Sequence, residues 1–247
     1  MVTALPAPGA RCPSAPPVVA EADGALWCPS PNFGPRREGA RPSLIVLHYT
    51  AMASAEGARD WLCNPKAEVS AHYVLAKEGC LWQLVAEADR AWHAGAGAWG
   101  ALGDVNSHSI GIEICNDGAQ PFAAPQMDAL ERLMQGIMTR WGIGPEGVVA
   151  HSDTALGRKI DPGRRFDWKR LARQGLAVWP EPSEPGDFLT DAARFGYDPA
   201  ADPDTILTAL RMRFRPWAEG PLDDEDRRIT ASLAARFPGP GTDIPTT

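Results

Sequence analysis

The sequence contains no run of Lys and Arg residues, no pair of cysteines at CxxC spacing and no long apolar stretch. Nucleic-acid binding requires a basic surface, so a chain of 247 residues with formal charge −7 predicts no nucleic-acid partner. A membrane span needs roughly 18 consecutive apolar residues, so we expect no membrane insertion. The cysteines (Cys12, Cys28, Cys63, Cys80 and Cys115) are odd in number and widely spaced, which favours free thiols over a disulfide framework or a zinc knuckle.

The start of the chain also lacks the continuous apolar segment of an export signal, because prolines interrupt MVTALPAPGARCPSAPP. Cys12 is not preceded by the apolar segment that a lipoprotein anchor requires. These features predict a cytoplasmic protein, provided that no export signal has been removed from the chain. We also expect a monomer.

The overall composition is that of a loop-rich globular protein. Hydrophobic residues make up 44% of the chain, and the length suffices for one sizeable core and a small second module. We expect an extended or disordered arm over residues 1–24, a main domain over 25–180, a proline-rich linker over 181–186 and a small domain over 187–247. The segment 181–247 is strongly acidic, with net charge −6.

Hydrophobic patterning predicts an α/β main domain. Short β-branched and aliphatic runs predict strands at 43–49, 72–76, 80–85 and 109–114, with a hairpin loop at 77–79. Apolar residues at helical spacing predict a helix over 127–141 that ends at Gly142 and covers the sheet. Similar spacing after residue 187 predicts three short helices, whose core is small enough that they should lean on the main domain.

The sequence has only five histidines, so each can be considered in turn as a metal ligand or catalytic residue. His48 ends the predicted strand 43–49, a position at which a histidine alone is more often structural than catalytic. His151 follows a short apolar run, and Asp161 comes ten residues later. Two histidines and a carboxylate match the three protein ligands of a catalytic zinc ion, although this spacing alone supports a zinc site weakly.

Six motifs, taken in order, resemble the zinc-dependent N-acetylmuramoyl-L-alanine amidases of the type 2 family. They are LHYT (47–50), VSAHY (69–73), WHAG (92–95), NSHSIGIEI (106–114), AHSD (150–153) and GRKIDPG (157–163). The resemblance covers residues 27–180 and implies a central mixed β-sheet flanked by helices, the fold shared with peptidoglycan-recognition proteins. Residues 187–238 are similar to a small three-helix peptidoglycan-binding domain, a weaker match.

Carried over by position, the resemblance implies that His48, His151 and Asp161 bind one zinc ion. Glu113 stands where the family has its general base, a carboxylate that accepts a proton from water and passes it to the departing amine. Lys159 stands where the family stabilises the oxyanion. The ordinary alternatives are a strand carboxylate for Glu113 and a solvated loop residue for Lys159.

Further residues are candidates for binding substrate: Tyr49, Trp92, His93 and Arg158. His93 is equally well explained as a residue that supports a zinc ligand or fills the core. The guanidinium of Arg158 suits a stem-peptide carboxylate, but a surface charge is as good an explanation. Of the remaining residues we expect His72 to be structural, His108 to be an exposed loop residue, and Trp82 and Trp141 to lie in the core. Trp99 is a candidate for the groove, with core packing as the alternative.

The function implied is hydrolysis of the amide bond between N-acetylmuramic acid, in its 1,6-anhydro form, and L-alanine during cell-wall recycling. The expected partners are muropeptides or peptidoglycan fragments. One alternative is an exported murein amidase or autolysin, which a peptidoglycan-binding domain would suit. Another is a noncatalytic peptidoglycan-recognition protein, against which the intact set of ligands and Glu113 argues. In the enzyme reading, the acidity of the C-terminal module suits adhesion to an anionic wall poorly, and the module would serve as a structural cover for the groove.

Overall fold

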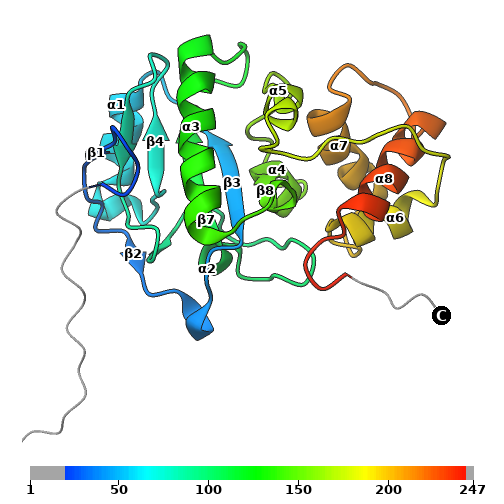
Figure 1. Cartoon of the computed structure of the whole chain (residues 1–247), viewed down its shortest axis with the longest axis horizontal. Coiled ribbons are helices and arrows are strands. Elements are labelled where there is room, and N and C mark those ends of the chain that lie inside the picture. Colours follow the sequence, from blue (N-terminus) through cyan, green and yellow to red (C-terminus); the bar gives the residue numbers. More distant parts are fainter. Residues whose placement is uncertain (1–19, 243–247) are drawn as a thin grey trace, which may run out of the picture.

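The computed structural model describes residues 20–242 and contains a six-stranded mixed sheet (Figure 1). The strand order is β1-β5-β4-β7-β3-β8, and a separate antiparallel pair joins β2 to β6. The strands are β1 (Leu26–Trp27), β2 (Phe33–Gly34), β3 (Leu44–Tyr49), β4 (Tyr73–Leu75), β5 (Leu81–Gln83), β6 (Arg90–Ala91), β7 (Ser109–Ile114) and β8 (Val148–Ala150). The helices are α1 (Ala55–Leu62), α2 (Val105–His108), α3 (Ala124–Trp141), α4 (His151–Thr154), α5 (Trp168–Arg173), α6 (Phe188–Phe195), α7 (Pro203–Phe214) and α8 (Asp224–Arg236). Three short 3₁₀ turns lie at Arg37–Gly39, Pro65–Ala67 and Pro145–Gly147.

Strands β4, β7, β3 and β8 run parallel, whereas β5 pairs antiparallel to β4. This is the mixed α/β architecture that the sequence indicates. The two longest strands, β3 and β7, lie side by side at the centre, with Leu44 opposite Ser109 and His48 opposite Glu113. Parallel neighbours in this register bring the carboxyl ends of both strands to the same edge of the sheet.

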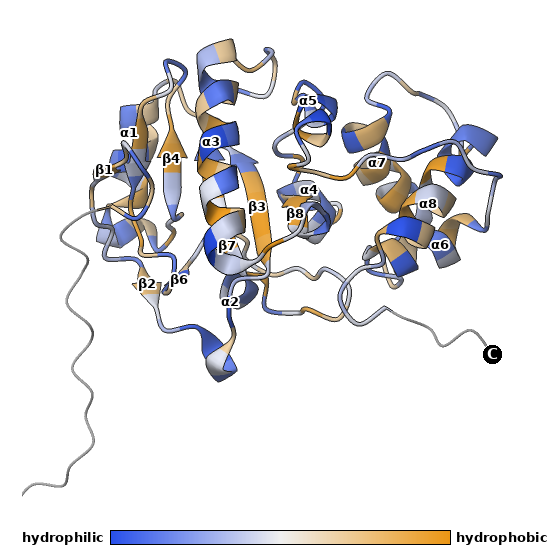
Figure 2. Ribbon diagram, in the orientation of Figure 1, coloured by the Kyte–Doolittle hydropathy of each residue, from blue (hydrophilic) through white to orange (hydrophobic). Residues whose placement is uncertain are grey.

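One face of the sheet is covered by α3. Ile45 and Leu47 of β3 and the isoleucines of β7 pack there against Leu130 and Met134. Because side chains alternate along a strand, the residues between them face the opposite side. Figure 2 shows β3 as hydrophobic along most of its length, as expected for a strand buried on both faces.

The other face is divided between two groups of helices. Helix α1 packs over β4 and β5, where Ala58 and Leu62 meet Val74 and Trp82. The C-terminal helices pack at the β3–β8 end, where Leu44 joins their apolar residues in a single buried cluster. Figure 1 shows α1 and the α6–α8 group at opposite ends of the sheet. The carboxyl ends of the central strands are therefore left open between them.

The C-terminal helices share their core with the sheet. The linker 181–186 has no regular secondary structure, and the three expected helices follow it as α6, α7 and α8. Trp99, from a loop of the main domain, packs edge-on against Phe195 and Tyr197. The division into separate domains stays a prediction, and the arm expected at 1–24 lies mostly outside the described residues, although Ala22 is buried against the sheet.

The predicted elements are found with shifted ends. The strands expected at 72–76 and 80–85 are found as Tyr73–Leu75 and Leu81–Gln83, and backbone hydrogen bonds from Ala76 N to Cys80 O and from Leu84 N to His72 O continue the pairing just beyond them. The hairpin loop between them is confirmed, with Gly79 at a positive φ of 89°. Helix α3 ends at Trp141, and Gly142 adopts the left-handed conformation that terminates it. No helix within residues 20–242 combines the length and hydrophobicity that crossing a membrane requires.

A buried carboxylate joins α3 to the sheet. Glu87 accepts hydrogen bonds from Tyr73 Oη (2.6 Å), from Trp141 Nε1 (2.6 Å) and from two nitrogens of Arg140. Burial opposes the charged form of Glu87, but the hydrogen bonds from Arg140, Tyr73 and Trp141 outweigh it and hold its pKa below the ordinary 4.5. Trp141, expected in the core, is thus only partly buried and uses its indole nitrogen here.

We predict that Glu87→Gln lowers the free energy of unfolding at pH 7 by roughly 2 kcal/mol, because it removes the charge of a buried acceptor that receives hydrogen bonds from Arg140, Tyr73 and Trp141. The charge of Glu87 stabilises the fold above its unfolded pKa, and this contribution is lost as the pH falls through the lower folded pKa. Denaturant unfolding of both proteins between pH 7 and pH 3 should therefore show the difference shrinking below about pH 4.5. A difference that stays constant over this range would contradict the assignment.

Candidate metal centre and active site

The candidate site is built at the open ends of the parallel strands. His48 is the fifth residue of β3, and its register partner Glu113 occupies the same position near the end of β7. Both side chains lie on the face opposite α3, because Leu47 and Ile112 next to them point into the α3 cluster. Strand alternation thus delivers one imidazole and one carboxylate to the same place.

Two further side chains come from the segment after β8. His151 is the first residue of the short helix α4, and Asp161 lies on the loop that follows it. The backbone nitrogen of Ser152 donates to the carbonyl oxygen of Asp161 at 3.0 Å, which ties the loop to the start of α4. His48, His151 and Asp161 are all buried.

The three side chains meet through one atom each. His48 Nδ1 lies 2.9 Å from His151 Nδ1, and both nitrogens lie 3.0 Å from Asp161 Oδ2. A tetrahedral zinc ion with bonds near 2.0–2.2 Å places its ligand atoms about 3.3 Å apart. The three atoms are therefore spaced as ligands of one small cation.

The hydrogen-bond partner of His151 fixes its tautomer. His151 Nε2 lies 2.9 Å from the carbonyl oxygen of Ala94, which can only accept a hydrogen bond. The proton of the neutral ring is therefore on Nε2, and Nδ1 presents a lone pair to the centre. A backbone acceptor of this kind is the usual outer partner of a metal-bound histidine.

A longer chain of hydrogen bonds does the same for His48. Ser109 Oγ donates to Val105 O at 2.5 Å, so it can only accept from His93 Nε2, 3.2 Å away. His93 Nδ1 then carries a lone pair and accepts from His48 Nε2 at 3.0 Å. This leaves His48 Nδ1 without a proton. Three acceptors now point at one another with no hydrogen to share, an arrangement that a bound cation stabilises.

Burial keeps the imidazoles of His48 and His93 neutral. It lowers the pKa of His48 to about 4, with the neighbouring His151 adding to the effect and Asp161 opposing it. Burial, with the nearby His48, also lowers the pKa of His93 well below its ordinary value. Burial disfavours the charged form of Asp161, but the close approach of His151 and His48 outweighs it and lowers the pKa of that carboxyl. Neutral imidazoles and a charged carboxylate are the forms that bind metal.

Gly111 leaves space for the His93 ring, which supports His48. A Cβ atom at position 111 would lie 2.4 Å from the Cγ atom of His93, far closer than side chains approach. Ser109, Gly111 and Glu113 alternate on the open face of β7, whereas Ile110, Ile112 and Ile114 face α3. The SIGIEI sequence of this strand therefore has one face for the core and one for the site.

Glu113 lies beside the three ligands in an unusual state. Its Oε2 atom is buried without a hydrogen-bond partner among the described residues. Burial, together with the charge of Asp161, raises the pKa of Glu113 to about 8, and Lys159 works in the opposite direction. An unsatisfied carboxylate with a raised pKa next to a candidate metal centre is typical of an acid–base group.

All predicted site residues line one pocket of about 380 Å³. They are His48, Tyr49, Trp92, His93, Glu113, His151, Arg158, Lys159 and Asp161. Tyr49 and Trp92 are half-buried in its wall, and Arg158 and Lys159 are exposed at its rim. One guanidinium nitrogen of Arg158 already donates to the carbonyl oxygen of Ala94 at 2.7 Å, so the remaining nitrogens are those that could meet a ligand.

The sequence reasoning missed the apolar rim of this pocket. Met52, Trp61, Val69 and Ile160 line it and are 37–60% exposed, although they are large and hydrophobic. They account for half of the large exposed hydrophobic residues in the described chain. Exposed apolar side chains gathered at one pocket indicate a ligand-binding surface. Trp61, on the outer side of α1, could have been found from its position on the polar face of an amphipathic helix.

One candidate position and one expected position are wrong. Trp99 does not lie in the groove, because its ring is buried against α6 and fills the shared core. His108 is not an exposed loop residue but the half-buried last residue of α2. His72, by contrast, is structural as expected: its Nδ1 accepts from Gly111 N at 3.0 Å and its Nε2 lies 3.1 Å from Asp89 O.

Comparison with known sequences gives a consistent result. The sequence model of the Amidase_2 family, N-acetylmuramoyl-L-alanine amidase, matches residues 38–164. The N-acetylmuramoyl-L-alanine amidase AmiD of Escherichia coli is 34% identical over 234 residues, which cover 80% of this chain and 84% of that protein. The 1,6-anhydro-N-acetylmuramyl-L-alanine amidase AmpD of Haemophilus influenzae is 33% identical over 57% of this chain and 86% of its own length.

Solved structures show the same fold. The complex of E. coli AmiD with anhydro-N-acetylmuramic acid-L-Ala-D-γ-Glu-L-Lys superposes with a TM-score of 0.72, covering 83% of this chain and 93% of that one. AmpDh3 of Pseudomonas aeruginosa in complex with anhydromuramic pentapeptide also gives a TM-score of 0.72, at 32% identity and with 82% and 94% covered.

The chain of hydrogen bonds behind His48 generates a prediction. We predict that His93→Met weakens binding of Co²⁺ or Zn²⁺ roughly 10–100-fold, because His48 Nε2 loses its acceptor and the ring is no longer held in one tautomer. His93→Gln, whose amide oxygen can accept the same hydrogen bond, should recover part of this loss. Competition titrations against a chromophoric chelator measure both effects. Equal affinities in all three proteins would show that His93 does not support the site.

Proposed function

Since the chain belongs to the N-acetylmuramoyl-L-alanine amidase family, we propose that His48, His151 and Asp161 bind a zinc ion. There the enzyme hydrolyses the amide bond between N-acetylmuramic acid and L-alanine. The observation that carries this proposal is the convergence of three lone pairs within 3.0 Å of one another, beside the unsatisfied Oε2 atom of Glu113. Two imidazoles and one carboxylate form a ligand set typical of zinc hydrolases, with a fourth position left for water.

A zinc ion at this site would lower the pKa of a bound water and polarise the scissile carbonyl. Glu113 is the proposed base, since its Oε2 atom is free to accept the proton of the attacking water. It then delivers the proton to the amide nitrogen as the C–N bond breaks, so the same carboxyl group serves as base and acid. Its raised pKa suits this exchange, because both protonation states are accessible near neutral pH.

Lys159 is the proposed partner of the carbonyl oxygen. It lies at the rim of the pocket, two residues before Asp161, and none of the ion pairs among the described residues involves it. An ammonium group facing the oxygen would stabilise the negative charge that develops there during attack. The charge of Lys159 acts on the site, because it also opposes the raised pKa of Glu113.

We infer that the substrate is a 1,6-anhydro-muropeptide. Relatives that cover most of this chain have been solved with anhydromuramic peptides. The apolar rim of Met52, Trp61, Val69 and Ile160 offers a surface for a sugar face and for the lactyl group. Trp92 and Tyr49 line the wall beneath it, and the free nitrogens of Arg158 suit a stem-peptide carboxylate.

Such a substrate places the enzyme in cell-wall recycling. We propose that it acts on soluble fragments, in keeping with the cytoplasmic location expected from the sequence. The small C-terminal domain would not be a wall anchor, since its acidic composition suits adhesion to an anionic polymer poorly.

Parallel digestions test the proposed function and its substrate. Purified zinc-loaded protein is incubated with anhydro-muramyl tripeptide and with intact sacculi, each with and without chelator, and the products are identified by mass spectrometry. We expect free tripeptide from the soluble substrate, and none after chelation. Release from sacculi at a similar rate would instead support an exported murein amidase, and no release from either substrate would support a recognition protein.

The assigned role of Glu113 generates a second prediction. Glu113→Gln should lower kcat on the soluble substrate at least about 100-fold while the protein still binds zinc, because the amide keeps the size of the side chain and removes its basicity. Glu78→Gln, in the exposed hairpin loop away from the pocket, is the matched control and should leave kcat unchanged. Retention of most activity in Glu113→Gln would exclude it as the base.

The apolar rim of the pocket generates a prediction about substrate binding. Trp61→Ala should raise KM roughly fivefold, the loss expected when about 1 kcal/mol of ring stacking is removed, with a smaller change in kcat. Trp217→Ala is a suitable control, because Trp217 is 73% exposed and lies outside this pocket. Steady-state kinetics on the soluble substrate measure both variants. An unchanged KM in Trp61→Ala would remove Trp61 from the binding surface.

A further inference from the structure

A further buried carboxylate belongs to the same short helix as the proposed metal ligand His151. Asp153 is in α4, two residues after His151, and it is completely buried. Its Oδ2 atom accepts a hydrogen bond from the backbone nitrogen of Ala150 at 2.9 Å. This bond closes the first turn of α4, so Asp153 fixes the backbone from which the His151 side chain projects.

The other partners of Asp153 come from the C-terminal helices. Arg213 of α7 donates from Nη1 to Asp153 Oδ2 at 2.7 Å, and Tyr197, just after α6, donates from its hydroxyl to Oδ1 at 3.0 Å. Arg213 also donates from Nη2 to the carbonyl oxygen of Val148 in β8, at 2.9 Å. One guanidinium thus bridges the start of β8 and the helix that starts with His151.

These donors are as deeply buried as the carboxylate. Arg213 and Tyr197 are at most 2% exposed, and the guanidinium of Arg213 lies 4.3 Å from the ring centroid of Trp168. A buried carboxylate without charged or polar partners is strongly disfavoured. Without α6 and α7, Asp153 would keep only the bond from Ala150 N, and the start of α4 would be expected to rearrange.

We propose that the C-terminal helices form part of the support of the metal centre, with Arg213 and Tyr197 acting through Asp153 as positioning residues for His151. The inference rests on the proposed zinc site and goes beyond it. It assigns the C-terminal segment a role in holding a metal ligand rather than in binding the wall.

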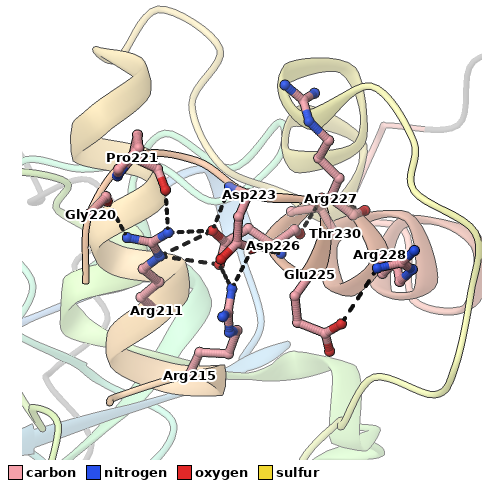
Figure 3. A network of polar contacts seen from close by, with 10 residues as sticks. All are labelled: Arg211, Arg215, Gly220, Pro221, Asp223, Glu225, Asp226, Arg227, Arg228 and Thr230. Carbon is pink, nitrogen blue, oxygen red and sulfur yellow. Dashed lines mark hydrogen bonds and ion pairs between the residues drawn. The ribbon is translucent and has the colours of Figure 1, made fainter. Parts of the chain in front are cut away.

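The chain offers a close control for this role. Arg211, two residues before Arg213 in α7, also forms a buried ion pair, with Asp226 at 2.5 Å (Figure 3). It further donates to the carbonyl oxygens of Gly220 and Pro221, and Arg215 reaches the same carboxylate. All of these partners lie within the C-terminal segment, and none of these hydrogen bonds reaches α4. Removing Arg211 therefore damages the same module without touching the support of His151.

The experiment compares zinc affinity and thermal unfolding in full-length wild type, Arg213→Met, Arg211→Met and Tyr197→Phe. We expect both arginine variants to lose a similar amount of thermal stability. Only Arg213→Met should weaken zinc binding, by roughly 10–100-fold, and Tyr197→Phe should weaken it severalfold with little loss of stability. Tyr197→Phe decides the matter if Arg213→Met does not fold.

Hydrogen exchange supplies a readout that needs no metal. The amides of Ala150 and Ser152 should exchange faster in Arg213→Met and Tyr197→Phe than in wild type, and at the wild-type rate in Arg211→Met. Unchanged exchange and unchanged affinity in Tyr197→Phe and in folded Arg213→Met, or equal loss of affinity in both arginine variants, would overturn the inference. If the wild-type protein binds no zinc but the variants differ from it in exchange as expected, the proposed zinc site is refuted and the supporting role of the C-terminal helices for α4 is not.

A different observation concerns two cysteines that are distant in the sequence. The Sγ atoms of Cys28 and Cys63 lie 4.0 Å apart, and Cys63 Sγ also donates to the carbonyl oxygen of Cys28 at 3.5 Å. The backbone nitrogen of Cys28 donates a hydrogen bond to the carbonyl oxygen of Gln83 in β5, and Cys63 is the C-terminal cap of α1. Because α1 carries Trp61 and Leu62 of the pocket wall, a bond here would tie that wall to the edge of the sheet.

We propose that Cys28 and Cys63 form a disulfide when the protein meets a disulfide oxidant such as glutathione disulfide. The Cys28 thiolate attacks the oxidant, forming a mixed disulfide and releasing one glutathione. The Cys63 thiolate then displaces the second glutathione, so the protein loses two protons and two electrons and the oxidant gains them. Burial, with the nearby Cys28, raises the pKa of the Cys63 thiol to about 12, so its thiolate is scarce and the second step depends on the proximity of the two sulfur atoms.

Mass spectrometry tests this pairing on the zinc-loaded protein incubated with glutathione disulfide. We expect a peptide cross-link between Cys28 and Cys63 without bound glutathione, and a rise in melting temperature of roughly 5 °C. Cys63→Ser should retain one glutathione at Cys28. Cys80, which is exposed, serves as an internal control for simple adduct formation. Separate glutathione adducts on Cys28 and Cys63 in the wild type, or two unmodified thiols, would refute the proposal.

Discussion

The structure depends on three hydrogen-bond acceptors held within 3.0 Å of one another. His48 Nδ1, His151 Nδ1 and Asp161 Oδ2 repel one another unless a cation lies between them, yet the groups around them leave each without a proton to share. The carbonyl oxygen of Ala94 holds the proton of His151 on the far side of its ring. The His93 ring, anchored on Ser109, does so for His48.

This arrangement follows from ordinary strand geometry. Parallel pairing of β3 with β7 brings His48 and Glu113 into register at the edge where both strands end. The period of two sends the isoleucines of β7 into the α3 core, and it sends Ser109, Gly111 and Glu113 to the site. A single strand therefore supplies the anchor of the His93 ring, the space for that ring and the candidate base. Packing of the β7 isoleucines against α3 fixes the positions of Ser109, Gly111 and Glu113, and the proposed chemistry depends on those positions.

Much of this could be predicted from the sequence, because it is encoded in local patterns. The central strands, helix α3 and the three C-terminal helices follow from periodicity and stop signals, and the ordered motifs place the expected site residues around one pocket. The rest depends on contacts between distant segments. Trp99 looked like a groove residue because nothing local reveals that α6 covers it. The bond between Arg213 and Asp153 joins residues 60 positions apart, and no local signal marks it. The short strand β8 was missed because three apolar residues give little periodicity. Helix α1 was missed although Ala55, Ala58 and Leu62 recur at helical spacing, because two of these three buried residues are alanines.

The most direct test of the metal centre is X-ray absorption at the zinc edge of the zinc-loaded, full-length protein. The account predicts four nitrogen or oxygen neighbours at about 2.0–2.2 Å, including the outer-ring scattering of two imidazoles. A spectrum with sulfur neighbours near 2.3 Å, or with a shell of oxygens alone, would place the zinc elsewhere and contradict the account.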